Sequence, residues 1–505
     1  MKLSIRFERK PGHARPLFGL IYAGLIALST LRGYFKLVNL PWFVTQFSYA
    51  AIIVLGVVWV FVSGQTSRIN ISVNVMLFQM IPNLIVLVWS VGLWVYRQEP
   101  LSQILRGSSL VLYQLLLLAM LISAGVMFGN QCIEYTALGL ILANTLILLD
   151  VIRRMGVGTT ITGMMQFLLS LGSHDNDISR ALEVQDPTFG IGILLMYYLV
   201  DGKDEHWRWF YIIALAFYTM TGFKRILFPA IGLGAVYYLL MMKLPRRIKT
   251  FTTVIIGTFL IFISLGYVIL IRSGLWFDLC ERFGIDLMGR KRLYGYMENY
   301  YSISPGYLGI GTGRVSTVLE VLEKTGNRRL HSDVLRMYIE LGMPMFLLWY
   351  FVTFIYTFIH FTNKYSQRAA VAYMAATLLM YVTFLTDNTL EKYCPEIAWH
   401  VLPLGIILAD REKFTSSFDL TARLSQLERS KSWKIQTSDS RTINSLTKKS
   451  KTYPSSEKQP EPNAKTSPAG NSSARNVAEA LSQFRKEKWE KNEKGESRKS
   501  SGRGR

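Results

Sequence analysis

The sequence predicts an all-α fold, a polytopic membrane helical bundle with a large exterior loop and a disordered tail. Two observations lead to this prediction. Half of the 505 residues are hydrophobic and the mean hydropathy is +0.25, which is high for a soluble protein. Apolar runs close to the roughly 20 residues that cross a bilayer recur throughout residues 1–410.

Twelve apolar runs are expected to form membrane-spanning helices. They are residues 17–31, 42–63, 70–96, 108–128, 135–151, 187–200, 208–222, 226–242, 251–271, 343–361, 369–386 and 396–410. A thirteenth run, 157–172, is short and rich in Gly and Thr, so it either spans the membrane or re-enters it. Twelve spans place both chain ends inside the cell, whereas a thirteenth would place the basic N-terminus outside.

Basic residues near span ends predict the side of each loop, because cytoplasmic loops carry an excess of Lys and Arg. The chain beyond residue 410 is strongly basic and is therefore placed inside. Counting back through the spans also places inside the segments 201–208, 243–249 and 363–368. The same parity places outside the segments 173–186, 223–225, 272–333 and 387–395.

Charge and composition divide the chain into a membrane domain, 1–410, and a tail, 411–505. The formal net charge is +22, and the tail alone holds 22 basic and 11 acidic side chains. The tail has few large apolar residues, so most of it is predicted to be disordered in the cytoplasm. Its stretch 476–490 could form an amphipathic helix that contacts anionic lipid or a partner, or it could be a solvated segment.

Composition also argues against several kinds of site. Three cysteines are too few for a disulfide-stapled secreted domain. The basic residues flank apolar runs instead of forming one stripe, so no nucleic-acid partner is expected. His174 lies beside Asp175 and Asp177, which is a weak arrangement for a metal site, and no metal or cofactor is predicted.

The 61-residue loop 273–333 is the largest place for chemistry outside the spans. Long loops are largely exempt from the positive-inside rule, so their basic residues are available for function. The loop carries seven acidic residues and eight basic ones, which are Arg282, Arg290, Lys291, Arg292, Arg314, Lys324, Arg328 and Arg329.

Two motifs lie in the middle of this loop. The segment GRKRLYGYMENYY, 289–301, places Arg290, Arg292 and several Tyr on one predicted helix. Guanidinium groups bind phosphate oxygens in a bidentate manner, so this helix is suited to a phosphate-bearing ligand. The segment GYLGIGTGR, 306–314, is a close-approach turn that lacks the spacing of a dinucleotide-binding fingerprint.

The end of the loop leads into the next helix through HSDVLRMYIELG, 331–342. Ser332 and Asp333 are expected to cap that helix, which places His331 at the outer membrane surface. A histidine at this position could act as a base, or it could be a surface residue beside the cap.

A short turn elsewhere, TGFKRILFPA at 221–230, carries Lys224 and Arg225 directly before an apolar run. A cation at such a depth is costly unless it is paired or faces a polar cavity. The pair therefore either contacts an anion or extends toward the interface with buried aliphatic stems.

Taken together and in this order, the motifs resemble the Wzy-type polysaccharide polymerases, which share a superfamily with the O-antigen ligases. The resemblance is closest to the Gram-positive polymerases of exopolysaccharide and capsule, and it covers roughly residues 40–410. The superfamily pattern of His, a small polar residue, nine residues and Gly is matched by His331, Ser332 and Gly342. Met345 stands where the family has Thr.

Other short matches follow the same order. Arg225 in TGFKR matches an Arg at the outer start of a span, and Gly289-Arg290 matches a Gly-Arg in the large outer loop. The GIGTG turn and the Thr386–Asn388 triplet TDN are also similar to the family. The run DPTFGIGILLMYYL, 186–199, is similar to the mid-chain signature of the polymerases.

The resemblance implies a GT-C-like bundle with an outward-facing cavity in the cell membrane. The family joins oligosaccharide repeat units carried on undecaprenyl pyrophosphate, and the growing chain is transferred to the non-reducing end of a fresh lipid-linked unit. Neither a nucleotide sugar nor a metal is implied. Membrane lipids, and a chain-length regulator or flippase of the same pathway, are the implied partners.

Residue roles follow from the resemblance and from the chemistry together. His331 is expected to act as the general base or to orient the acceptor. Arg225 and Arg290 are expected to hold the pyrophosphate in a partly dry cavity. Secondary contacts to the pyrophosphate or glycan are assigned to Arg292, Lys224 and Arg314, and Asp387 is expected to support the base or contact the acceptor.

Three alternatives remain open at this point. An O-antigen-ligase-like enzyme would transfer finished glycan to another acceptor. A transporter or flippase of lipid-linked sugars should instead place its cations within the spans, while here they concentrate at the outer face. A membrane scaffold would explain the basic tail but not the exterior loop.

Overall fold

The computed structural model describes residues 15–412, apart from 33–36, 38–39, 42, 65–67, 170–184, 203–206, 223, 285–286, 288 and 323–328. The chain divides into two units, Met1–Ala422 and Arg423–Arg505, and all described residues belong to the first. The predictions for the N-terminal segment, for His174 and for the tail with its stretch 476–490 lie outside the described residues.

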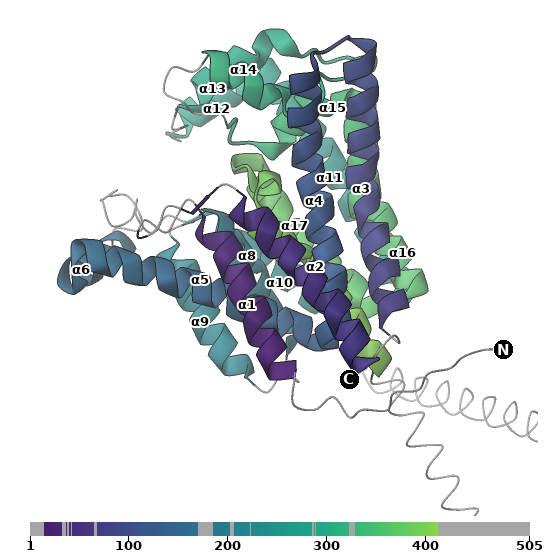
Figure 1. Cartoon of the computed structure of the whole chain (residues 1–505). Coiled ribbons are helices and arrows are strands. Elements are labelled where there is room, and N and C mark those ends of the chain that lie inside the picture. The colour runs from purple at the N-terminus through teal and green to yellow at the C-terminus, as the bar shows by residue number, and fades with distance from the viewer. Residues whose placement is uncertain are drawn as a thin grey trace, which may run out of the picture. The chain divides into compact units, whose positions relative to one another are not determined.

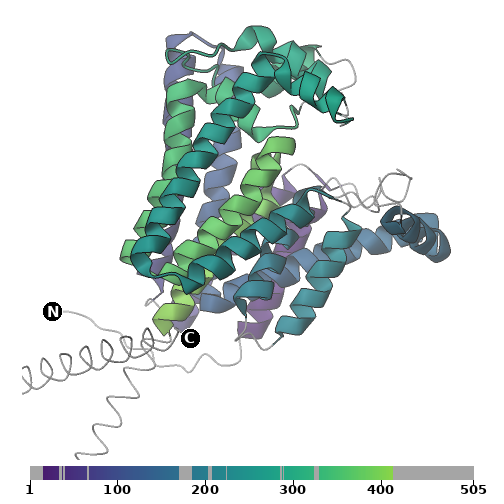
Figure 2. The same ribbon diagram turned by 180° about the vertical axis from the view of Figure 1, so that it is seen from behind.

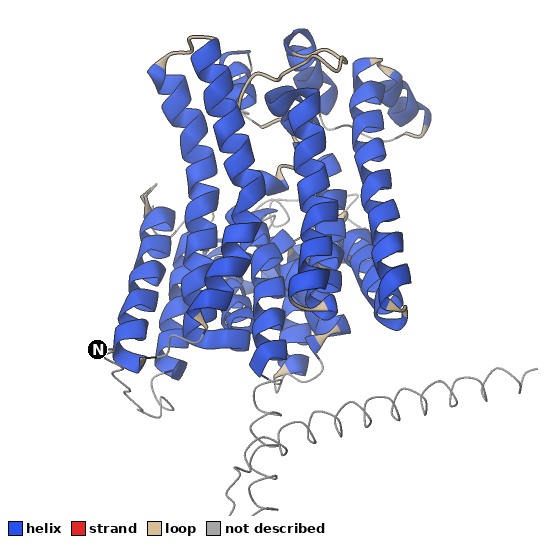
Figure 3. Cartoon of the chain, turned by 90° about the vertical axis from the view of Figure 1, so that its right-hand side faces the viewer, coloured by secondary structure: helices blue, strands red, loops and turns tan. Residues whose placement is uncertain are grey.

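The described residues form helices and no strand, as the colouring of Figure 3 shows. The first half of the chain contains α1 (Arg15–Leu31), α2 (Val44–Ser63), α3 (Ile69–Tyr96), α4 (Leu101–Phe128), η1 (Gly129–Gln131), α5 (Cys132–Met155), α6 (Val157–Leu169), α8 (Gln185–Val200), α9 (Arg208–Thr221) and α10 (Leu227–Lys243). The second half contains α11 (Arg246–Arg272), α12 (Leu275–Arg282), α13 (Arg290–Met297), η3 (Glu298–Tyr300), α14 (Arg314–Leu322), α15 (Asp333–Tyr350), the π-helix η4 (Phe351–Tyr356), α16 (Thr357–Lys364), α17 (Gln367–Thr386), η5 (Thr389–Glu391) and a last helix, 393–412.

Each of the twelve predicted spans coincides with helical residues. Six helical segments are long and apolar enough to cross a membrane: Val44–Ser63, Ile69–Tyr96, Leu101–Met155, Arg246–Arg272, Asp333–Lys364 and Gln367–Thr386. The prediction of a membrane helical bundle is thereby confirmed at this level, and the count of twelve spans stays a prediction. The described part of the thirteenth run is α6, whose 13 residues cover about 20 Å, less than a hydrocarbon core of about 30 Å.

Proline and glycine set several helix ends. Pro100 and Pro245 stand in extended conformation directly before α4 and α11, where a missing N–H costs nothing. Gly64 and Gly156 follow α2 and α5 with φ of 64° and 83°, a region that glycine enters without a Cβ penalty.

Two groups of helices build the bundle. In one, α1 packs on α2 and α5, and α2 also packs on α4, which pairs with α3. In the other, α17 packs on α10 and α16, and α10 packs on α8. The cores merge into one large apolar cluster. Figures 1 and 2 show α12, α13 and α14 gathered at one end of the bundle.

Polar contacts join the loops at the other end of the helices. Arg368 Nε lies 2.8 Å from Asp201 Oδ1, and Arg368 Nη1 lies 3.1 Å from Asp410 Oδ1. Arg246 donates a hydrogen bond of 2.9 Å to Asn363 Oδ1. The segments that the sequence places together on the inner side therefore meet one another.

Candidate functional site

Three segments that are distant in sequence meet around Asp387. Lys224 Nζ, from the turn before α10, lies 3.8 Å from Asp387 Oδ2. His331 Nδ1, from the end of the long loop, lies 3.9 Å from Asp387 Oδ1. Arg290, the first residue of α13, donates a hydrogen bond of 2.8 Å to the carbonyl oxygen of Thr386. These residues belong to three of the four segments that the sequence places on the outer side.

Asp387 occupies the C-cap of α17 and is buried. Its Oδ1 accepts a hydrogen bond of 2.8 Å from the Asn388 N–H, and Lys392 Nζ lies 3.9 Å away. Burial alone would raise the pKa of this carboxyl, but His331 and the charges of Lys392 and Lys224 outweigh it and hold the pKa below its usual value. Asp387 is therefore an ionised carboxylate at neutral pH.

The backbone of His331 is held in an unusual conformation. Its φ is 58°, the left-handed region that non-glycine residues seldom occupy. The His331 N–H donates to Asn388 Oδ1 at 3.0 Å, and the Asp333 N–H donates to the Asp387 carbonyl oxygen at 3.1 Å. Because both contacts fix this corner against the end of α17, the imidazole is aimed at Asp387 while 26% of its side chain stays exposed.

We call Lys224, His331, Asp387 and Lys392 the Asp387 cluster. Two ammonium groups face its single carboxylate, and Arg290 adds a third cation at the edge. The cluster therefore carries excess positive charge beside a group that can accept a proton, an arrangement suited to a bound anion. Lys392 is the most buried cation and lies 5.7 Å from the centroid of the Phe189 ring.

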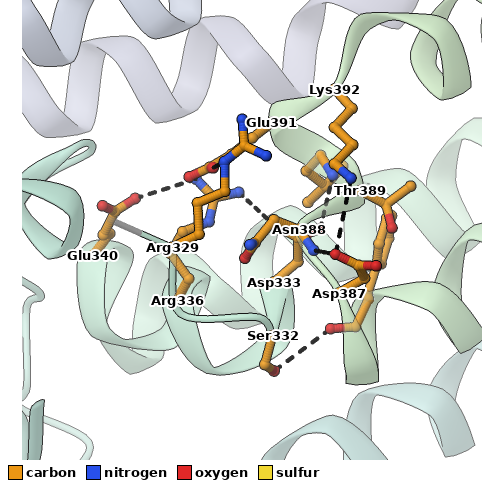
Figure 4. Close-up of polar contacts among 12 residues, drawn as sticks. Arg329, Ser332, Asp333, Arg336, Glu340, Asp387, Asn388, Thr389, Glu391 and Lys392 are labelled. Carbon is orange, nitrogen blue, oxygen red and sulfur yellow. Dashed lines mark hydrogen bonds and ion pairs between the residues drawn. The ribbon is translucent and has the colours of Figure 1, made fainter. Parts of the chain in front are cut away.

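A second group of charges lies next to the first, and Figure 4 shows it together with Asp387 and Lys392. We call Asp333, Arg336, Glu340 and Glu391 the Arg336 cluster. The Arg336 guanidinium lies 2.8 Å from Asp333 Oδ1, 3.2 Å from Glu391 Oε1 and 3.6 Å from Glu340 Oε2. Arg329 Nε approaches Glu391 Oε2 at 3.8 Å.

The two clusters share backbone segments. Asp333 Oδ2 accepts a hydrogen bond of 2.7 Å from the Leu390 N–H, so it ties the start of α15 to the turn that carries Asp387 and Lys392. Ser332 caps α15 by accepting the Leu335 N–H at 3.3 Å, which confirms its predicted role. The Arg336 cluster thus holds the corner on which His331 stands.

A small cavity adjoins the Arg336 cluster. It offers water about 70 Å³ of space, and its lining includes Arg336, Glu340, Glu391, Asn83 and Gln114 among apolar side chains. This space holds several water molecules, which can hydrate the buried charges.

The glycine-rich turn has a structural role. α15 is broken at Gly342, whose φ is 74° and ψ 169°. The N–H groups of Ile310 and Gly311 donate to the carbonyl oxygens of Ile339 and Glu340 at 3.0 and 2.8 Å, and Met343 N–H donates to Tyr307 O at 2.9 Å. A Cβ at Gly342 would overlap the backbone of Leu308, so only glycine fits. The motif joins the loop to the span.

The structure separates the remaining predicted site residues from this group. Arg225 is exposed in the same turn as Lys224, and Arg292 is exposed on α13. Arg314 pairs with Glu99 at 3.4 Å, near the turn between α3 and α4. Lys324 and Arg328 lie outside the described residues.

Cysteine and metal chemistry receive no support from the described part of the chain. Cys132, Cys280 and Cys394 are free and buried. Among residues 15–412 with their gaps, no group of three His, Cys, Asp or Glu side chains could hold a metal ion.

Sequence reasoning did not single out Lys392, Arg336, Glu340 or Glu391. The spacing of Asp333, Arg336 and Glu340 by three and four residues on one apolar helix was a usable signal, because charges on a buried helix face must be paired. Glu391 and Lys392 follow Asp387 closely, but nothing in the sequence shows that their side chains point toward different clusters.

Comparison with protein-family models gives no match, and comparison with curated protein sequences gives none. The chemistry of the site therefore has to be inferred from its geometry. Cations beside a partly exposed imidazole can stabilise negative charge on a ligand while the imidazole removes a proton from a second group.

Proposed function

We propose that this protein is a polysaccharide polymerase of the cell membrane, a metal-independent glycosyltransferase that joins lipid-linked oligosaccharide repeat units at the outer face. The observation that carries the proposal is the Asp387 cluster, in which a partly exposed imidazole and two ammonium groups surround one carboxylate, with Arg290 nearby. The resemblance of the His331–Gly342 pattern to Wzy-type polymerases supports the same choice.

In the proposed reaction, the acceptor sugar hydroxyl attacks the anomeric carbon of the growing chain. His331 Nδ1 faces Asp387, so Nε2 is the nitrogen that takes the hydroxyl proton, while Asp387 stabilises the resulting imidazolium. The new glycosidic bond forms as the bond to undecaprenyl pyrophosphate breaks. Lys224, Lys392 and Arg290 neutralise the charge that develops on the departing pyrophosphate.

The test compares His331→Ala, Lys224→Met and Arg290→Met in cells at matched protein levels. We expect long polymer to fall by about 10²-fold or more, as is usual for loss of a general base, with single lipid-linked units accumulating outside. Lys291→Met, which changes an exposed neighbour of Arg290, is the control and should keep polymer length. Normal polymer in all three site variants would contradict the proposal.

The variant Arg225→Met tests whether Arg225, as the resemblance implies, or Lys224, as the contacts of the structure indicate, binds the pyrophosphate. The resemblance assigns the pyrophosphate to Arg225, whereas the ion pair with Asp387 is made by Lys224. A larger loss of polymer in Lys224→Met than in Arg225→Met would favour the contacts of the structure, and the reverse order would favour the family pattern.

Two further functions have specific support. A ligase-like enzyme would use the same cluster, and it would leave long polymer attached to its lipid when the cluster is broken. A flippase or transporter is favoured by the break in α15 and by the buried charges within it, since discontinuous spanning helices often form transport sites. In that case the variants would trap lipid-linked units on the inner leaflet.

A further inference from the structure

Helix α12 has three distinct faces, although it is only eight residues long. One face packs on the protein, with Cys280 buried and Trp276 and Phe277 half-buried. The Trp276 ring lies 5.1 Å from the Tyr267 ring, and the Phe277 ring lies 6.3 Å from the Tyr294 ring. These contacts fix the rotation of the helix about its axis.

The two outward faces differ in chemistry. Leu275, Leu279 and Phe283 recur every fourth residue and form an apolar strip, with 53%, 39% and 72% of each residue exposed. Asp278 and Glu281 are exposed and fall on another side of the helix, while the exposed Arg282, seven residues after Leu275, lies at the edge of the apolar strip. A helix with separate protein-facing, apolar and charged faces is suited to the boundary between lipid and water.

An exposed apolar surface on α11 precedes this strip. Phe251, Ile255, Phe259, Phe262 and Ile269 are exposed along α11, and successive members are four, four, three and seven residues apart. The 27 residues of α11 reach about 40 Å, which exceeds a hydrocarbon core of about 30 Å. A helix of this length can extend beyond the hydrocarbon core, and Gly274, with φ of 81°, turns the chain after Arg272 into α12.

We propose that α12 lies in the membrane interface at this end of the bundle, with Leu275, Leu279 and Phe283 inserted among the acyl chains of a phospholipid leaflet. The charged face then points to water. α12 precedes α13, whose first residue is Arg290. Contact between α12 and lipid would therefore set the position of α13 and Arg290 relative to the membrane surface. The inference stands on packing and exposure alone, and it does not depend on the proposed enzymatic function.

The experiment uses the full-length protein in phospholipid nanodiscs. The single variants Leu279→Cys, Phe283→Cys and Glu281→Cys are labelled with an environment-sensitive fluorophore, and Glu281→Cys is the matched aqueous control on the same helix. The native cysteines are buried, and labelling of the parent protein measures their background. Quenching is compared between lipids with a nitroxide near the headgroup and iodide in the buffer.

We expect lipid nitroxide to quench the probes at 279 and 283 about threefold more than the probe at 281, and iodide to show the reverse order. Adding Leu279→Glu should lower lipid quenching of the probe at 283 several-fold. Strong iodide quenching at all three positions would overturn the proposal in favour of a water-exposed helix. Protection of 279 and 283 from both quenchers would overturn it in favour of a protein contact, including a second copy of this chain.

Discussion

The two charge clusters have opposite compositions. The Asp387 cluster places cations around one carboxylate at 3.8–3.9 Å, and part of its His331 side chain is exposed. The Arg336 cluster places three carboxylates around one guanidinium at 2.8–3.6 Å, and the arginine side chain is only 9% exposed.

This difference suggests that the Asp387 cluster binds a ligand, whereas the Arg336 cluster supports the structure around it. Arg336 is paired with three carboxylates by short, buried contacts, and an unpaired buried charge is costly, so this cluster acts as a framework. Longer contacts and excess positive charge leave the Asp387 cluster able to accept an anion. Because Asp333 and Leu390 connect the two, the framework sets the position of the site.

Removing the central guanidinium is expected to have the largest effect. Arg336→Met leaves Asp333, Glu340 and Glu391 as buried carboxylates without their shared cation, and it should lower the free energy of unfolding by about 3–5 kcal/mol. Thermal unfolding of the purified protein in detergent measures this. Arg247→Met, at an exposed position on α11, should stay within about 0.5 kcal/mol of the wild type. Equal midpoints for the two variants would remove the framework role.

Acid stability tests the other cluster. The pKa of Asp387 is below its usual value, so its contribution to stability is complete above the unfolded-state pKa of about 3.9 and is lost as the pH falls through the folded-state pKa. In Lys224→Met/Lys392→Met, burial is no longer offset by these charges, so the pKa of Asp387 rises. Each unit of that rise costs about 1.4 kcal/mol at neutral pH.

The measurement is the pH at which folded protein is half lost. We expect the double variant to lose its fold at a pH about one unit higher than the wild type. The exposed Lys291→Met variant should not move the midpoint. If the double variant had the wild-type midpoint, the two lysines would not stabilise the ionised form of Asp387.

The smallest expected effect separates the backbone of His331 from its imidazole. With φ at 58°, His331→Gly should be more stable than His331→Ala by about 1 kcal/mol, because only glycine adopts this region without steric cost. Thermal midpoints measure the difference, and both variants should lack activity. A more stable alanine variant would show that the corner is not strained.

The sequence predicted the fold class and much of the Asp387 cluster, because the relevant signals are local. Apolar run length predicted helices, and the parity of the basic loops predicted that Lys224, Arg290, His331 and Asp387 share one side. The sequence-based prediction placed Arg225 before Lys224, whereas Lys224 makes the ion pair with Asp387. Which of the two neighbours points toward Asp387 depends on how α10 docks against α17.

The break in α15 at Gly342 could not be predicted from the sequence either. Gly342 belongs to the resemblance pattern, and Pro344 follows it, yet neither indicates that a loop 30 residues earlier fills the gap. Long-range backbone hydrogen bonds of this kind depend on tertiary packing and not on local propensity. The residue was noticed for its place in a motif, while its physical role is to let two backbones touch.

That break has a consequence for how the protein is made. Residues 307–311 leave the ribosome before residues 339–343, whose backbone groups they bind. The N–H groups of Ile310 and Gly311 are therefore already synthesised when the carbonyl groups of Ile339 and Glu340 are made. Those carbonyl groups can be hydrogen-bonded at once, which matters because an unpaired backbone group in lipid is costly. If the glycine-rich turn followed α15 in the sequence, the same backbone hydrogen bonds could still form in the folded protein. The carbonyl groups of α15 would then be synthesised before the N–H groups that bind them.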